Sequence, residues 1–224
     1  LPDDLNDAIY PLLFQKFEEM NIGYFFYIGG NDSMDTVSKL SRYAAAHNID
    51  VRIMGIPKTI DNDLILTDHT PGFGSAAKYV ASTVREIVLD ASVYQQRSVT
   101  IVEIMGRNAG WLVGAAALSK GEDCDGPDLI YVPELPFDID NFLVRIKELL
   151  AEKTFVVVAV SEGIRLADGR YVCELTDGVD FVDAFGHKQL TGTANYLARR
   201  LAQEIGCKTR TIELSSMQRA ASHL

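Results

Sequence analysis

Two aspartates lie close to a lysine in residues 57–63, which read PKTIDND. If the chain stays extended here, the alternation of a strand places Thr59, Asp61 and Asp63 on one side. Two carboxylates beside the ammonium group of Lys58 suit magnesium-assisted phosphoryl transfer, because one carboxylate can take the proton of an attacking hydroxyl while charge is neutralised around the phosphates. A solvated acidic turn is the alternative, since Asp-Asn-Asp is common turn chemistry.

A second candidate is residues 29–33, GGNDS, which follow the apolar run YFFYI and precede a segment with helical spacing. The two glycines permit a tight turn, and the N-terminus of the following helix would face a bound phosphate. The segment matches neither GxGxxG nor the Walker pattern GxxxxGK[ST]. An ordinary turn, with Asp32 or Ser33 as helix N-cap, is the alternative. A phosphate site here would hold the Asp32 carboxylate where an anion has to enter, so its ligand must be unusual.

A third candidate is residues 103–111, EIMGRNAGW. Gly106 and Gly110 flank Arg107, whose guanidinium would project from a strand end and could clamp a phosphate. A surface arginine is the alternative. Further cations near other strand ends could complete an anion-binding cluster in a chain of net charge −10, namely Arg97, Arg210 and Arg219.

One glycine pattern points to a different ligand. Gly72, Gly74 and Ala77 fit the dinucleotide fingerprint GxGxxA. The preceding TDHT is not a buried strand, and the acidic residue after the helix, Glu103, comes roughly 30 residues on instead of about 20. We therefore interpret these glycines as a hinge and a helix start.

These loops depend on alternating strands and helices to position them. Apolar spacing predicts helices over residues 5–20, 37–48, 75–91, 108–121 and 138–150, the last with Asp140 as N-cap, and strands over residues 24–28, 51–57, 98–104, 129–133 and 154–160. We expect the strands at 24–28 and 154–160 to be buried. This order indicates right-handed crossovers and a doubly wound α/β fold with mostly parallel sheets, in which ligands bind beyond the carboxyl ends of the strands. Residues 61–74, rich in Asp, Thr, Pro and Gly, are the expected hinge or linker.

Composition limits the class of partner. The 224 residues are 47% hydrophobic and 23% charged, which is enough for one large or two small folded domains. The net charge of −10 disfavours nucleic acid and anionic membrane as partners. Three widely spaced cysteines, Cys124, Cys173 and Cys207, indicate free thiols in a reducing compartment. No apolar run approaches the roughly 20 residues that span a bilayer. We therefore expect a cytoplasmic protein.

Taken in order, the three loops resemble the motifs of the phosphofructokinase family. GGNDS resembles the family's phosphate loop, PKTIDND its TIDND catalytic loop, and QRSVTIVEIMGRNAG the stretch that ends in MGRxxG. VAVSEG and TRTIELSSMQR look like later sugar-phosphate segments, so the resemblance covers essentially the whole chain. It implies part of a two-domain architecture, with a phosphoryl-donor domain at 1–72, a sugar-phosphate domain at 73–217 and the return to the donor domain at 218–224. Family members normally extend further at both ends, and we expect weak or no activity from residues 1–224 alone.

The family transfers a phosphoryl group to O1 of fructose 6-phosphate in glycolysis. The resemblance implies that Asp61 takes the O1 proton, with Asp63 close to the reacting phosphate, Thr59 bonded to it and Lys58 beside it. The implied sugar-phosphate pocket contains Met105, Gly106 and Arg107, with Glu162 accepting from sugar hydroxyls and Arg219 on the 6-phosphate side. Ser216 departs from the His or Tyr of many members.

The resemblance also implies a partner chain and a cofactor. Arg97 and Arg210 would reach into the site of a neighbouring subunit, which implies a homo-oligomer with shared active sites. Mg²⁺ is the implied cofactor, with Asn31 and Asp32 as candidate ligands, although many members have Asp where this chain has Asn31.

The implied donor site consists of Gly29, Gly30, Asn31, Asp32, Ser33 and Lys58. Members that use ATP resemble one another in having Gly at the fourth position of the GG loop, which leaves room for the α-phosphate. Here Asp32 fills that room with a side chain and a negative charge, and Lys58 stands where ATP users typically have Gly. We therefore expect pyrophosphate as the donor. An ATP-dependent member, a non-catalytic regulatory subunit of the same fold and, third, an NAD-linked dehydrogenase are the alternatives.

Overall fold

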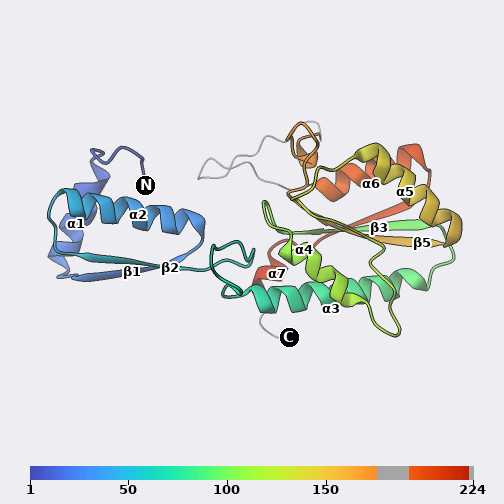
Figure 1. The fold of residues 1–224 in the computed structure, drawn as a ribbon, viewed down its shortest axis with the longest axis horizontal. Coiled ribbons are helices and arrows are strands. Elements are labelled where there is room, and N and C mark those ends of the chain that lie inside the picture. Colours follow the sequence, from blue (N-terminus) through green and yellow to red (C-terminus); the bar gives the residue numbers. More distant parts are fainter. Residues whose placement is uncertain (176–191, 222–224) are drawn as a thin grey trace. The chain divides into compact units, whose positions relative to one another are not determined.

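The computed structural model describes residues 1–175 and 192–221 and is shown in Figure 1. The chain forms two compact units, Leu1–Thr59 and Ile60–Leu224. Within the described ranges, no helix has the length and apolar content that crossing a bilayer requires. The three cysteines are free thiols, as predicted, with Cys124 buried and Cys173 and Cys207 half-buried.

The first unit is a two-stranded parallel sheet with two helices packed against it. Its elements are α1 (Ile9–Glu19), β1 (Tyr24–Gly29), α2 (Asn31–Ala46) and β2 (Arg52–Pro57), and the strands pair from Tyr24↔Arg52 to Gly29↔Pro57. Aromatic rings dominate the core, where Phe14 stacks on Tyr43 with ring centroids 5.1 Å apart. A tight βα turn joins β1 to α2, where a Cβ on Gly29 would overlap the side chain of Ser33.

The expectation that YFFYI is a buried strand is wrong for the described chain. Phe25 packs against the core of α1 and α2, but Tyr24, Phe26 and Ile28 are 70%, 55% and 62% exposed. The side chains of a strand point alternately to the two faces of its sheet, and helices of this unit pack on only one face. The other face of β1 therefore stays uncovered within the described residues.

The second unit is a four-stranded parallel sheet in the order β4-β5-β3-β6. Its elements are α3 (Phe73–Ser92), β3 (Ser98–Ile104), α4 (Trp111–Ala115), the 3-10 helix η1 (Ala116–Ser119), β4 (Leu129–Tyr131), α5 (Ile139–Glu152), β5 (Phe155–Ser161), the 3-10 helix η2 (Val172–Leu175), α6 (Thr193–Glu204), β6 (Lys208–Glu213) and α7 (Met217–Ala220).

Helices cover both faces of this sheet (Figure 1). On one face α3 and α4 pack on the side chains of Val102 and Ile104, and on the other α5 and α6 pack on Val99 and Ile101. Every residue of β3 is buried as a result. The mostly parallel, doubly wound α/β class predicted from the alternating periodicities is confirmed.

Two helix ends differ from the sequence prediction. Asp138, not Asp140, is the N-cap of α5, because the helix begins at Ile139 and the Asp138 side chain accepts from the Asn141 N–H at 3.0 Å. Asp140 lies inside the first turn. Gly30, not Asp32 or Ser33, is the N-cap of α2. The helix expected over 108–121 is split into the short helix α4 and η1.

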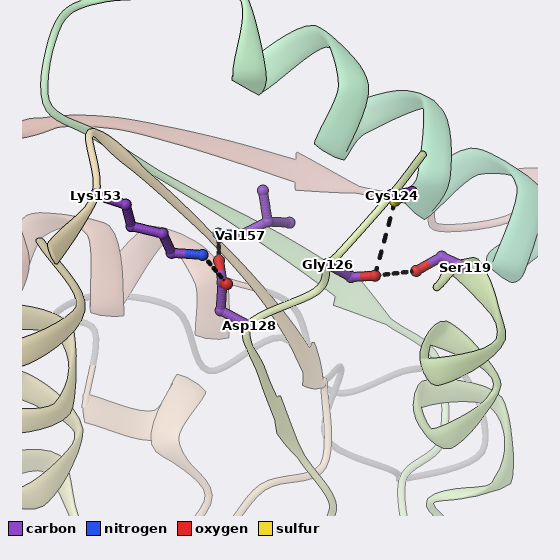
Figure 2. Close-up of polar contacts among 6 residues, drawn as sticks. All are labelled: Ser119, Cys124, Gly126, Asp128, Lys153 and Val157. Atoms are coloured by element: carbon purple, nitrogen blue, oxygen red, sulfur yellow. Dashed lines mark hydrogen bonds and ion pairs between the residues drawn. The ribbon is translucent and has the colours of Figure 1, made fainter. Parts of the chain in front are cut away.

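A buried carboxylate joins β4 to β5. Asp128 Oδ2 accepts from the Val157 N–H at 2.8 Å, and Asp128 also forms an ion pair with Lys153 (Figure 2). Nearby, the Gly126 carbonyl accepts from Ser119 Oγ at 2.6 Å. The Asp128 side chain is 9% exposed, so water cannot replace it as an acceptor.

We expect Asp128→Ala to lower the free energy of unfolding by about 3 kcal/mol, because it leaves the Val157 N–H without an acceptor and the Lys153 ammonium unpaired. Urea unfolding followed by circular dichroism measures this change. Asp168→Ala is the control, since it removes an exposed ion pair with Arg170 and should leave the unfolding midpoint almost unchanged. Equal midpoint shifts in the two variants would contradict the structural role of Asp128.

Candidate functional site

Polar residues gather at the carboxyl edge of the four-stranded sheet. The ends of β3 and β5 are aligned at Ile104↔Ser161, so Met105–Arg107 and Glu162 leave the sheet side by side. Gly106 N–H donates to Glu162 Oε1 at 3.3 Å. The chain after β6 returns to the same place, where Gln218 accepts from the Met105 N–H at 3.3 Å and Arg219 follows in α7.

Asp61 belongs to this cluster. Burial raises the pKa of its carboxyl group and the charge of Asp63 raises it further, while the guanidinium groups of Arg107 and Arg219 lower it. A carboxylate with a raised pKa is a stronger base than an ordinary aspartate. The site therefore combines a half-buried base with two cations that can bind an anion.

The extended conformation expected for residues 59–63 is wrong. Asn62 has φ of +57°, in the left-handed region that Asn tolerates better than most residues. Its buried side chain closes the loop by accepting from the Thr70 N–H at 2.9 Å and donating to the Asp68 carbonyl at 3.1 Å. The turn separates the environments of the two carboxylates, since Asp61 is half-buried and Asp63 is exposed.

Glu162 is the second titratable group of the cluster. Burial and, to a smaller extent, the charge of Asp61 raise its pKa to about 7. The Gly106 N–H and the guanidinium groups of Arg107 and Arg219 act in the opposite direction. Glu162 can therefore accept or donate hydrogen bonds to a neutral polar ligand near neutral pH.

Two glycines set the path of the Arg107 backbone. Gly106 has φ of +140°, which L residues rarely adopt, and a Cβ there would overlap the Ala109 carbonyl oxygen. A Cβ on Gly163 would overlap the carbonyl oxygen of Arg107 itself. The backbones after β3 and β5 are thus in direct contact.

Gly163→Ala is expected to weaken anion binding at this cluster by at least about tenfold, because the new methyl group displaces the Arg107 backbone and misplaces its guanidinium. Isothermal titration calorimetry with inorganic phosphate measures the effect. Gly114→Ala is the control, since a Cβ at this position of α4 meets nothing within 4 Å. Unchanged affinity in a folded Gly163→Ala protein would contradict a role for this backbone contact.

The predicted donor residues lie together in the first unit. Gly29 and Gly30 follow β1, and the Gly29 carbonyl accepts from the Lys58 N–H at 2.7 Å where β2 ends. A Cβ on Gly30 would lie 3.7 Å from the Lys58 carbonyl oxygen. Asn31, Asp32 and Ser33 form the first turn of α2. The structure brings these six residues to the carboxyl edge of the β1–β2 sheet, where α2 begins.

The acidic residue at position 32 also has a structural explanation that needs no ligand. Asp32 lies in the first turn of α2, and an acidic side chain at a helix N-terminus stabilises the helix. The described residues contain no group of three or more His, Cys, Asp and Glu side chains arranged to hold a metal. Mg²⁺ commonly takes only one or two protein oxygens and completes its shell with phosphates and water. The oxygens of Asn31 and Asp32 fit that chemistry as a partial ligand set.

Arg97 and Arg210 lie at the opposite edge of the four-stranded sheet. The Arg97 carbonyl accepts from the Lys208 N–H at 3.3 Å, beside the first pair of β3 and β6. The Arg210 guanidinium pairs with Asp90 at 3.1 Å and stacks on the Tyr94 ring at 4.5 Å from its centroid. The structure does not bring these two arginines to the carboxyl-edge cluster.

Sequence reasoning missed two buried residues of the carboxyl edge, Gln218 and Glu103. Gln218 is 1% exposed and bridges α7 to the loop after β3. Glu103 is 4% exposed. A glutamate inside the apolar run SVTIVEI was a usable signal, whereas nothing in the sequence around Gln218 marks it as buried.

A family model and individual relatives of known name both match this chain and point to the same family. The family model described as Phosphofructokinase matches residues 4–223. A Xanthomonas campestris protein named Pyrophosphate–fructose 6-phosphate 1-phosphotransferase is 43% identical over 219 residues, which is 97% of this chain and 52% of that protein. A Rhodospirillum rubrum protein of the same name is 47% identical over 182 residues, 81% of this chain and 44% of that protein.

The fold has a solved counterpart. The crystal structure of pyrophosphate-dependent phosphofructokinase from Marinobacter aquaeolei superposes with a TM-score of 0.77 at 35% identity, and the match covers 96% of this chain and 50% of that one. The chain therefore spans about half the length of these relatives.

Proposed function

Because the chain belongs to the phosphofructokinase family, we propose that the protein carrying it is an enzyme that phosphorylates O1 of fructose 6-phosphate with pyrophosphate, reversibly, in glycolysis. The products are fructose 1,6-bisphosphate and phosphate. One observation carries the proposal: half-buried Asp61, its pKa raised, lies within electrostatic reach of Arg107 and Arg219 beside Glu162. This arrangement supplies a base and an anion-binding pair in one place.

The acceptor half of the reaction uses the carboxyl-edge cluster. Arg219 binds the 6-phosphate side, Met105, Gly106 and Arg107 line the pocket, and Glu162 accepts hydrogen bonds from sugar hydroxyls. Asp61 takes the O1 proton as O1 attacks phosphorus. The bond between that phosphorus and its bridging oxygen breaks, and inorganic phosphate leaves. Thr59 and Asp63 act next to the phosphoryl group, with Asp63 also raising the pKa of Asp61.

The donor half uses the turn between β1 and α2. Gly29 and Gly30 let the backbone approach the phosphates, and the N–H groups of the first turn of α2, which includes Ser33, face them. The Lys58 ammonium offsets their charge, and Asp32 closes the space that a nucleotide would need. Asn31 and Asp32 would hold Mg²⁺, which would neutralise donor charge.

We further propose a homo-oligomer in which Arg97 and Arg210 serve a neighbouring subunit. Their place at the opposite edge from Arg107 supports this role, because it keeps them away from the carboxyl-edge cluster of their own chain. The functional boundary at residue 72 and a cytoplasmic location stay predictions of the same proposal.

A donor comparison tests the proposed function. The intact protein that carries this chain is assayed with fructose 6-phosphate and Mg²⁺, with pyrophosphate or ATP as donor, and phosphorylated product is measured. We expect turnover with pyrophosphate and at least about a hundredfold lower kcat/KM with ATP, since charge and bulk at Asp32 both oppose the nucleotide. Preference for ATP would refute the donor assignment, and no turnover with either donor would favour a non-catalytic subunit.

A further inference from the structure

Glu103 is a buried carboxylate at the carboxyl end of β3 that the proposed reaction does not use. It lies between Val160 of β5 and Glu213 of β6 in the sheet and is 4% exposed. A carboxylate in such a place is costly unless it is hydrogen-bonded. Glu103 Oε2 accepts from the Ala194 N–H at 2.7 Å. The residue therefore satisfies a backbone donor at the start of α6.

The start of α6 in turn contacts the loop that carries Glu162. Thr193 Oγ1 donates to the Glu162 carbonyl oxygen at 3.2 Å. On the other side, the Glu162 N–H donates to the Ile104 carbonyl at 2.9 Å, one residue beyond Glu103. The backbone of Glu162 is thus held between the end of β3 and the first turn of α6, and Glu103 links these two elements.

We propose that Glu103 is a positioning residue for sugar-phosphate binding, which holds the first turn of α6 so that Thr193 fixes the backbone of Glu162. This inference rests on the proposed function, because it assigns Glu162 to the sugar hydroxyls. Two substitutions separate the role of Glu103 as a hydrogen-bond acceptor from its negative charge. Alanine removes the acceptor for the Ala194 N–H, whereas glutamine keeps an acceptor and removes the charge.

The groups around Glu103 agree with this geometry. Burial and the charges of Glu213 on β6 and Glu162 after β5 raise the pKa of Glu103 to about 7, while the N–H groups of Ala194 and Gly192 act to lower it. The hydrogen bond from the Ala194 N–H thus favours the ionised form of Glu103, which burial opposes.

The test compares Glu103→Ala and Glu103→Gln in the intact protein. We expect Glu103→Ala to raise KM for fructose 6-phosphate about tenfold while KM for pyrophosphate stays within about twofold, because only the Glu162 side of the site is displaced. Glu103→Gln should restore most of the affinity. Glu204→Gln, which changes an exposed carboxylate in the last turn of α6 that pairs with Arg200, should leave both KM values within about twofold.

Distinct results overturn the inference. An active, folded Glu103→Ala protein with unchanged KM for fructose 6-phosphate, or with both KM values raised equally, would leave Glu103 a purely structural role. If Glu103→Ala does not fold, Thr193→Val decides, because it removes the donor to the Glu162 carbonyl oxygen, and an unchanged KM for fructose 6-phosphate in that variant overturns the inference. A wild-type protein that does not turn over fructose 6-phosphate overturns the proposed function itself, and this assignment with it.

Discussion

Asp61→Asn is expected to lower kcat for phosphoryl transfer to fructose 6-phosphate by a factor of about 10²–10⁴, which is the usual contribution of a general base. The amide has the shape of the carboxylate but cannot take the O1 proton. KM for fructose 6-phosphate should change little, because the proposed sugar-phosphate ligands Arg107, Glu162 and Arg219 are unchanged. Steady-state kinetics give kcat, and calorimetric titration gives the affinity for fructose 6-phosphate.

The pH dependence of the reaction provides a check on the same residue. Asp61 acts as a base only when ionised, so activity should be lost as the pH falls through its raised pKa. Asp63→Asn removes a charge that raises this pKa, and the acid limb of the kcat profile should then move to lower pH. An Asp61→Asn protein that keeps more than about a tenth of wild-type kcat would exclude Asp61 as the base.

Stability distinguishes a chemical effect of Asp61→Asn from unfolding. The folded-state pKa of Asp61 is raised above its unfolded value, so its contribution to stability is present at low pH and is lost as the pH rises through the folded pKa. At neutral pH the neutral amide avoids the cost of burying this charge. The variant should therefore melt no lower than the wild type, and a lower melting temperature would point to misfolding.

The second large effect is expected from Asp32→Gly combined with Lys58→Gly. The ratio of kcat/KM with ATP to kcat/KM with pyrophosphate should rise by about a hundredfold or more. Asp32→Gly removes the like-charge repulsion and the steric crowding of the nucleotide, and Lys58→Gly removes a cation that favours the shorter donor. The backbone bond from the Lys58 N–H to the Gly29 carbonyl does not need the lysine side chain, so the turn should persist. Donor-dependent initial rates measure the ratio.

Single variants divide this effect between the two residues. Asp32→Gly alone should admit ATP, and Lys58→Gly alone should mainly weaken pyrophosphate binding. Asp35→Gly is the matched control, since it puts glycine into α2 and removes the ion pair with Lys39 without touching the donor turn. A donor ratio that does not move in the double variant, or that moves as much in Asp35→Gly, would refute the roles of Asp32 and Lys58.

Local patterns were sufficient to predict most of the secondary structure. The strand predicted at residues 98–104 is β3, and the periodicity of residues 75–91 marks the helix α3. The exact helix ends were harder to predict. Asp138 and Asp140 are equally good N-caps by residue type, and only the start of α5 at Ile139 selects Asp138. The exposure of YFFYI could not be predicted, because burial depends on what packs on the sheet and not on the strand's own residues.

The sequence by itself determined the family and the order of strands and helices as far as β5, and it predicted the three loops that we propose carry the chemistry, because these are written in motifs and spacings along the chain. Only the tertiary structure decided which carboxylate becomes the stronger base, since a left-handed turn at Asn62 half-buries Asp61 and leaves Asp63 exposed. Folding alone also brings Glu103 to Ala194, 91 residues apart in the chain. Burial and long-range hydrogen bonds depend on neighbours distant in sequence, and no local pattern encodes them.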